Sequence, residues 1–280
     1  MKFRHQIKYI ILVASIGICA CKKVINVDLN NAAPAIVIEG NVNNLPGPYQ
    51  VKLTSSISYT NDNIYPGVTG ALVTIKDDST GITDILTENT NGNYLTNKTI
   101  GVSGHTYHLY VKSNGKEYTA TSTMPRQVML DSITFLTNSG FGEINVSPQP
   151  NFQDPGGIYN AYEFLETYHG VPSKRIFVIN DEFSDGRYVV RPLRNDSTYI
   201  QSGDEVQLEM RCIDKNIFNY LKELGRQDPT NGQPTSPANP TSNINNGALG
   251  YFSAHTTQKK KAVYKSVSYT HLTLPTKRIV

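Results

Sequence analysis

The chain has 280 residues, of which 38% are hydrophobic, and a formal net charge of +3. Three of its 26 basic residues lie within residues 1–20 and two within residues 267–280, and neither segment contains an acid, which leaves 21 basic against 23 acidic residues in between. The resulting net charge of −2 argues against a nucleic-acid partner. The length is sufficient for two ordinary domains.

The start of the chain has the pattern of a secretory signal peptide. Residues 1–8 carry three basic residues and no acid, and residues 9–20 form an apolar run that is too short for a membrane-spanning helix. The run ends in the sequence ICAC, which resembles the bacterial lipoprotein signal. Bulky Ile18 disfavours Cys19 as the modified residue, so we predict cleavage before Cys21 and lipidation of its thiol. The alternatives are an ordinary signal peptide and a buried apolar strand.

A polar tether at residues 21–34 leads into an N-terminal β-sandwich domain, which we expect to cover residues 35–126. Short stretches of alternating apolar and polar residues are separated there by turn residues. The clearest signal is residues 106–124, where Asn114-Gly115 supplies the two positive-φ residues of a type I′ hairpin turn. The other strands are expected at residues 35–40, 49–59, 71–77, 83–86 and around Tyr94.

A C-terminal β-rich domain is expected at residues 127–265. Its clearest strand is residues 204–214, where every second residue from Val206 to Cys212 is apolar, so Cys212 is predicted to be a buried core thiol. One helix is expected at residues 214–225, with Asp214 as its N-cap and Gly225 as its C′ residue. A loop is predicted at residues 148–157, and further strands at residues 142–146, 162–168, 175–179, 188–191 and 248–254.

The predicted fold class is mainly β: two consecutive β-sandwich domains, Ig-like or transthyretin-like, with one short α-helix in the second. With Cys19 removed and Cys21 lipidated, Cys212 has no partner for an intramolecular disulfide. The stretch SVSYTHLTLPT near the C-terminus can be encoded by a nucleotide tract that resembles a transposase sequencing adaptor. We therefore interpret residues 266–280 as adaptor read-through and exclude them from the fold; the alternative is a genuine final strand.

The sequence shows no catalytic constellation, and we expect neither an enzyme nor a cofactor. The motifs of serine hydrolases, zinc peptidases, phosphate-binding loops and paired cysteines do not occur. His105 and His108 are three residues apart on a predicted strand, so they should point to opposite faces and share no metal. Asp181, Glu182 and Asp185 are interpreted as a solvated hairpin turn, because a phenylalanine stands where a calcium loop needs an oxygen ligand.

Binding is expected at two long loops, residues 61–70 and 227–247, because sandwich sheets bury their alternating faces and leave recognition to loops. The second loop follows the predicted helix, which would hold its base. Its Asn and Gln side chains offer paired donors and acceptors for neutral polar ligands, and tyrosines add aromatic surface. The alternative is that both loops are merely permissive surface. The candidate residues are Tyr65, Asn231, Asn239, Asn243 and Tyr251.

Several stretches together resemble one family: CKKVINVDLN, IVIEGNV, YPGVTGALVTIKD, IDKNIFNYL and PANPTSNINNGALGYFSA. The chain from Cys21 to about Ala254 resembles the Bacteroidota lipoprotein family of the domain of unknown function 4249. The resemblance implies an outer-membrane-associated lipoprotein that is often encoded near TonB-dependent transporters. It implies no catalytic residues.

We therefore expect an exported protein that is anchored to the outer membrane through lipid on Cys21 and faces either the periplasm or the cell surface. The favoured function is a non-enzymatic accessory binding protein of a TonB-dependent uptake system, with an outer-membrane transporter as partner. A structural or adhesive cell-surface protein is the second interpretation, and an envelope hydrolase ranks last.

Overall fold

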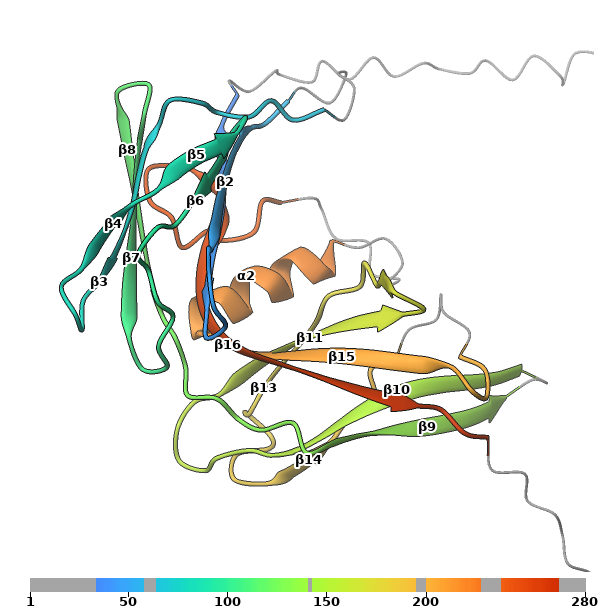
Figure 1. The fold of residues 1–280 in the computed structure, drawn as a ribbon. Helices are drawn as coiled ribbons and strands as arrows, with labels where there is room; N and C mark the ends of the chain where they lie inside the picture. The colour runs from blue at the N-terminus through green and yellow to red at the C-terminus, as the bar shows by residue number, and fades with distance from the viewer. Residues whose placement is uncertain (1–33, 58–63, 141–142, 195–199, 228–237, 267–280) are drawn as a thin grey trace, which may run out of the picture. The chain divides into compact units, whose positions relative to one another are not determined.

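The structure, a computed structural model shown in Figure 1, describes residues 34–57, 64–140, 143–194, 200–227 and 238–266. The predicted signal peptide, Cys21, Asn231 and the tail from residue 267 lie outside the described residues. The described part is mainly β, as predicted, and contains one helix, α2 (Lys215–Arg226).

Most strands belong to one nine-stranded sheet. Its strands follow in the order β12 (Val171–Pro172), β11 (Ala161–Tyr168), β15 (Glu205–Cys212), β16 (Leu249–Val263), β1 (Ile36–Asn43), β2 (Gln50–Ser55), β6 (Asn93–Leu95) and β5 (Thr87–Thr90). The ninth strand, β13 (Phe177–Asn180), pairs with β11 beside this path.

Strand β16 joins two parts of this sheet that lie far apart in the sequence (Figure 1). Residues 249–255 pair in parallel with β1, and residues 256–263 pair antiparallel with β15. Gly250 has a φ of +91°, and a Cβ atom there would lie 2.1 Å from the carbonyl oxygen of Ile38. Only glycine therefore permits this close parallel approach. The sequence predicted only the first half of β16.

Two smaller sheets complete the fold. The four-stranded sheet has the order β4 (Thr83–Ile85), β3 (Leu72–Asp77), β7 (Thr106–Ser113) and β8 (Lys116–Thr123). The three-stranded sheet has the order β14 (Tyr188–Val190), β10 (Glu143–Gln153) and β9 (Ser132–Gly140). The predicted hairpin is confirmed, because Asn114 and Gly115 join β7 to β8 with φ angles of +48° and +73°.

The first hydrophobic core is formed by β1, β2, β3, β7, β8 and the first half of β16. Most apolar residues that alternate along the predicted strands are buried, namely Val51, Leu53, Val73, Ile75, Tyr107, Leu109 and Val111, whereas Ile57 and Ala71 are half-buried. Burial of each large side chain contributes about 1.5–3 kcal/mol. Ile244 and Phe252 also belong to this core. A segment assigned to the C-terminal domain by the sequence thus completes the first core, and the domain boundary at residue 126 stays a prediction.

The second core is formed mainly by β10, β11 and β15. The rings of Phe152 and Tyr162 pack edge to face, 4.8 Å apart. Cys212 is only 3% exposed, and burial raises the pKa of its thiol. The prediction of a buried core thiol is confirmed. A third cluster packs α2 against neighbouring strands through Ile217, Phe218, Tyr220 and Leu221.

The predicted loop at residues 148–157 is wrong in its first half, because β10 continues through Pro148 and Pro150 to Gln153. The carbonyl oxygen of Pro148 accepts a hydrogen bond from the Leu193 N–H at 2.9 Å, on the edge opposite β9. In an antiparallel strand, the N–H and C=O groups of one residue point to the same edge, and those of the residue two positions along point to that edge again. Pro148 and Pro150 therefore both face the edge opposite β9. Neither proline therefore removes a hydrogen bond to β9.

Helix α2 begins as predicted but ends later. The Oδ1 atom of Asp214 accepts hydrogen bonds from the backbone N–H groups of Asn216 at 2.9 Å and Ile217 at 3.0 Å, which makes Asp214 the N-cap. Gly225, predicted as the C′ residue, lies inside the helix, and Gln227 is the C-cap. A glycine inside a helix costs about 1 kcal/mol relative to alanine, which the burial of the apolar face of α2 offsets.

Candidate functional site

A hollow of about 390 Å³ opens between β8, the first half of α2 and residues 241–245. We call it the neutral hollow, because every residue that lines it is uncharged. The lining residues are Thr119, Ala120, Thr121, Asn216, Asn219, Thr241, Ser242, Asn243 and Asn245.

The wall along β8 is made by a segment that covers the edge of this strand. The N–H of Asn245 donates to the Thr119 carbonyl at 3.0 Å, and the Thr119 N–H donates to the side-chain oxygen of Asn245 at 2.7 Å. The amide nitrogen of Asn245 also donates to the Thr119 hydroxyl at 2.7 Å. These bonds pair the backbone N–H and carbonyl groups of Thr119 on the edge of β8 and fix the Asn245 side chain in one orientation.

The same segment is fixed to β16 by side chains that form hydrogen bonds with the backbone groups of that strand. Asn243 bonds both backbone groups of Phe252: its Oδ1 accepts from the N–H at 3.0 Å, and its Nδ2 donates to the carbonyl at 2.8 Å. The Ser242 hydroxyl donates to the Gly250 carbonyl at 2.7 Å. The backbone of this wall is therefore held in place by internal hydrogen bonds.

The helix wall is tied to both strands through one buried hydroxyl group. Ser122 is 2% exposed, and its Oγ accepts a bond from the Ala254 N–H at 2.8 Å and donates to the carboxylate of Asp214. β8, β16 and the start of α2 thus meet at Ser122. Asn216 and Asn219 follow directly on the exposed side of the helix, three residues apart and hence on neighbouring positions of one face.

The chemistry of the neutral hollow suits binding. Amide and hydroxyl groups provide donors and acceptors in close proximity. No carboxylate, imidazole, thiol or amine belongs to its lining within the described part of the chain.

Of the predicted binding residues that the structure describes, Asn243 alone lines this hollow. Tyr65 is exposed on the segment before β3, and Asn239 is exposed ahead of the hollow's wall. The ring of Tyr251 packs 5.1 Å from that of Tyr220 on α2, where burial raises the pKa of its hydroxyl. Binding through Tyr65, Asn239 and Tyr251 stays a prediction.

Sequence reasoning missed the residues on β8 and α2. Thr119 and Thr121 alternate with buried Tyr118 and Ala120, so their outward orientation was available from the period of two. Asn216 and Asn219 were available as a pair on one helix face. Nothing local indicated that these two surfaces meet.

The other clusters singled out by the sequence have structural partners. Nδ1 of His105 lies 2.9 Å from the carboxylate of Asp77, whereas His108 contacts Asp78, so the two histidines have different partners. Residues 181–186 form a turn in which Glu182 and Asp185 are exposed, as predicted, but Asp181 at its start is buried.

Asp181 belongs to a set of carboxylates that hold turns together. Its oxygens lie within 4.8 Å of those of Asp154 and Asp185. Asp181 accepts from the Asn160 N–H at 2.6 Å, and Asp185 accepts from the Gly157 N–H at 2.7 Å. Because these bonds occupy the carboxylates, we assign them to the turns rather than to a ligand.

One further pair of carboxylates lies on the nine-stranded sheet. Nε of Arg211 is 2.6 Å from Glu209, and its Nη1 is 3.3 Å from Glu163. Burial raises the pKa of Glu163. Burial acts in the same direction on Glu209, but Arg211 and Lys259 outweigh it and lower the pKa of that group. Arg211 pairs with both carboxylates, so this cluster has a structural role.

A comparison with family models gives one match, described as "Domain of unknown function (DUF4249)", over residues 22–261. The chain belongs to this family. The match covers the first core, all of the second core except Tyr264, and every residue of the neutral hollow, and the family's description names no activity. No curated protein matches the chain. Within the described residues, no helix has the length and apolar character needed to cross a bilayer.

Proposed function

We propose that this DUF4249 protein is a non-enzymatic binding protein, tethered to the outer membrane through lipid on Cys21, that serves a TonB-dependent uptake system. One observation carries the binding role: the neutral hollow is lined by uncharged polar side chains on walls fixed by internal hydrogen bonds. A fixed wall loses little conformational entropy on binding, which favours recognition.

The ligand of the neutral hollow is a neutral molecule rich in hydroxyl or amide groups. An asparagine amide can donate to one ligand oxygen and accept from another, and Asn216 and Asn219 on α2 bring two such amides to this hollow. A charged ligand would lose hydration without gaining a counter-charge from the lining. The volume of about 390 Å³ corresponds to a small ligand or to one unit of a longer chain.

A double variant tests this role in the purified full-length protein. Asn216→Ala with Asn219→Ala removes two amides from the exposed helix wall without touching the bonds that fix the other wall. We expect retention of neutral oligosaccharides on an affinity column to fall about tenfold, which corresponds to about 1.4 kcal/mol. Because no titratable group lines the hollow, retention should not change between about pH 5 and 8.

The matched control is Asn138→Ala with Asn145→Ala, two exposed asparagines that face each other on β9 and β10. It should retain the oligosaccharides like the wild type. Equal retention by both double variants would contradict the assignment of the hollow. Acidic oligosaccharides that bind better than neutral ones would contradict the ligand class.

The tether and the partner are tested separately. Cys21→Ser should release the protein from the membrane fraction or leave the precursor uncleaved, because the thiol that receives the lipid is gone. Capture of membrane proteins by the wild type from the native host should recover an outer-membrane transporter. A Cys21→Ser variant that matures and fractionates like the wild type would contradict lipid attachment at Cys21. It would not affect the oligosaccharide test of the neutral hollow.

A further inference from the structure

A second hollow, of about 900 Å³, lies beside the other half of α2. Three segments form it: β13 with the residues just before it, the stretch of residues 191–194 after β14, and α2 from Leu221 onward. We call it the basic hollow. Its lining includes five cationic residues, Arg175, Arg191, Arg194, Lys222 and Arg226, and no acidic residue among those described.

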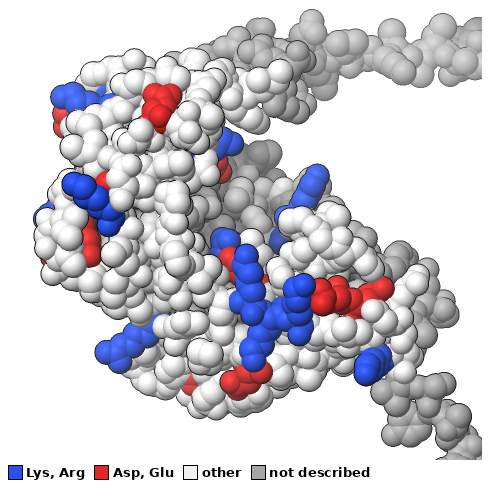
Figure 2. Space-filling model, viewed as in Figure 1, with Lys and Arg blue, Asp and Glu red and all other residues white. Residues whose placement is uncertain are grey.

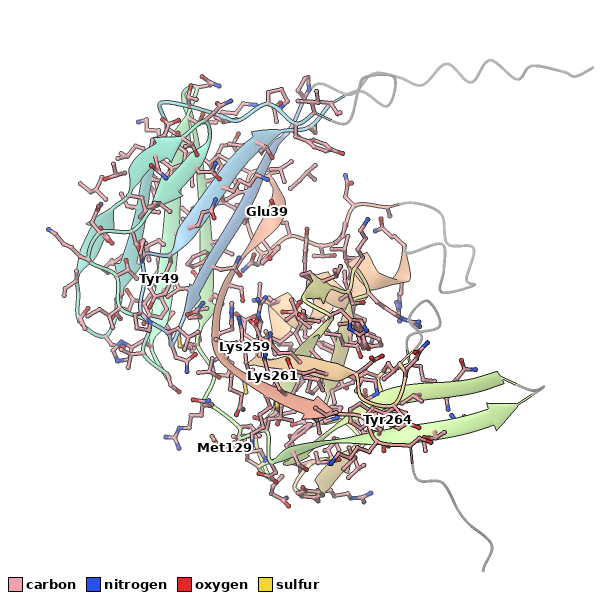
Figure 3. All side chains as sticks on the ribbon, turned by 45° about the vertical axis from the view of Figure 1, so that its right-hand side comes forward. Glu39, Tyr49, Met129, Lys259, Lys261 and Tyr264 are labelled. Atoms are coloured by element: carbon pink, nitrogen blue, oxygen red, sulfur yellow. The ribbon has the colours of Figure 1, made fainter. Side chains whose placement is uncertain are left out.

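Within the described residues, three cations of the basic hollow lack the acidic partners that two lysines of β16 have. Lys259 and Lys261 of β16 (Figure 3) lie 3.2 Å and 2.7 Å from Glu209 and Glu205. Figure 2 accordingly shows basic and acidic side chains next to each other over β15 and β16. Arg191, Arg194 and Lys222, by contrast, form no ion pair with any acid of the described residues.

The backbone that carries these cations is fixed. β13 pairs with β11 over four residues, and the Leu193 N–H donates to the Pro148 carbonyl at 2.9 Å. Ile176, just before β13, lies against α2 at Gly225: a Cβ atom built there would be in ordinary van der Waals contact with Cβ of Ile176, at 3.6 Å. The cations thus extend from three anchored segments into one space.

Such a concentration of like charge attracts a multiply charged anion. Cations such as Arg191, Arg194 and Lys222, gathered beside a low-dielectric wall, raise the local potential and the local concentration of anions. Arginine presents a planar fork of N–H donors that fits the oxygens of a phosphate group, and lysine adds a point charge. Ile176, Leu193 and Leu221 line the same hollow and provide apolar surface for an uncharged part of the ligand.

We propose that the basic hollow is a binding site for a phosphate ester that carries more than one negative charge. A phosphate ester directs oxygens to several sides at once, which matches cations that arrive from three segments. The same chemistry occurs in a free phosphate ester and in a phospholipid headgroup. This site is independent of the neutral hollow and of its proposed ligand.

The test is a triple variant of the purified full-length protein, Arg191→Gln, Arg194→Gln and Lys222→Gln. Its matched control is Lys116→Gln, Arg126→Gln and Arg187→Gln, which removes the same three charges from exposed positions that do not line the hollow. The soluble probe is pyrophosphate, and citrate serves as a carboxylate of comparable charge. The lipid probe is a phosphatidylcholine vesicle with and without phosphatidic acid.

We expect pyrophosphate to bind the wild type and the control alike and to bind the triple variant at least tenfold more weakly. Binding to phosphatidic acid vesicles alone, again lost in the triple variant, would support the site with a lipid headgroup as its source. The proposal is overturned if neither probe binds, if both triple variants lose the same affinity, or if citrate binds as tightly as pyrophosphate. Circular dichroism of both variants verifies that they are folded.

Discussion

The neutral and the basic hollow share helix α2 as a wall and differ in how their polar groups are used. In the neutral hollow, Asn243 and Asn245 already bond the backbone of β16 and β8. In the basic hollow, Arg191 and Arg194 carry their charge on long exposed side chains. The first arrangement selects by fixed geometry, and the second selects by charge.

The two hollows also depend on different elements of the fold. The walls of the neutral hollow consist of strand edges and a segment that completes the first core, so damage to β16 should reach it directly. The basic hollow is assembled from β13, residues 191–194 and the second half of α2, none of which pairs with β16. Each prediction below tests this separation.

Gly250→Ala should have the largest effect. The new Cβ atom would lie 2.1 Å from the Ile38 carbonyl oxygen at a φ of +91°. Steric conflict with the backbone and left-handed strain together should lower the free energy of unfolding by about 3 kcal/mol or more in urea titrations. Binding of neutral oligosaccharides should weaken more in this variant than binding of pyrophosphate does.

The control for this prediction is Gly203→Ala, because Gly203 has a φ of +102° but nothing within 4 Å of the new Cβ atom. It adds strain without a clash and should cost about 1 kcal/mol. Equal losses for the two variants would show that the parallel contact between β16 and β1 is not tight.

Local signals in the sequence predicted the elements that local chemistry determines. Asn114-Gly115 fixed a hairpin, the alternation that ends at Cys212 fixed a strand, and Asp214 fixed the start of α2. The prolines of β10 were misjudged, because whether a proline breaks a strand depends on which edge its missing N–H would face. That edge is known only once the neighbouring strands are placed.

The sites could not be predicted, because they depend on contacts between residues that are distant in the sequence. The neutral hollow needs Thr119 beside Asn245, and the basic hollow needs Arg191 near Lys222. The parallel pairing of β16 with β1 brings the end of the chain to its beginning, and an alternating pattern specifies a face but not a partner. The asparagine-rich loop was predicted as a binding region, but the side chains of Asn243 and Asn245 form hydrogen bonds within the protein.

Asp214→Ala should have the second largest effect and should affect both hollows. It removes the N-cap of α2 and leaves the buried Ser122 hydroxyl without its acceptor. We expect a loss of about 2 kcal/mol in the free energy of unfolding. Because the two hollows share the helix, both ligands should bind more weakly.

Asp214→Asn is the matched control, because asparagine is also a good N-cap: its carbonyl oxygen can accept the two backbone bonds, and only the acceptor for the Ser122 hydroxyl is lost. It should cost less than half as much as the alanine variant. A result in which only one ligand is affected by Asp214→Ala would show that α2 is not a common wall.

Asn243→Ala should have a smaller effect that is confined to the neutral hollow. The change leaves the N–H and carbonyl groups of Phe252 without the amide that now bonds both. We expect a loss of about 1–2 kcal/mol in urea titrations, weaker retention of neutral oligosaccharides and unchanged binding of pyrophosphate. Exposed Asn239 provides the control, since Asn239→Ala should change the free energy of unfolding by less than about 0.5 kcal/mol.

An exchange of charge between the hollows should have the smallest effect on stability and the clearest effect on binding. Asn219 and Lys222 are both exposed on α2, and each lines a different hollow. Asn219→Lys should change the free energy of unfolding by less than about 0.5 kcal/mol, because both residues are tolerated on an exposed helix face. It replaces a group that donates and accepts with one that only donates, so retention of neutral oligosaccharides should fall while pyrophosphate binding is unchanged.

Lys222→Asn should do the reverse, weakening pyrophosphate binding and leaving oligosaccharide retention the same. It removes the 5.3 Å contact between Nζ of Lys222 and the Phe218 ring, which should cost at most about 1 kcal/mol in the free energy of unfolding. Both variants are measured by urea unfolding and by the two binding assays in parallel. If either substitution changes both ligands together, the two hollows are one site, and the comparison between them fails.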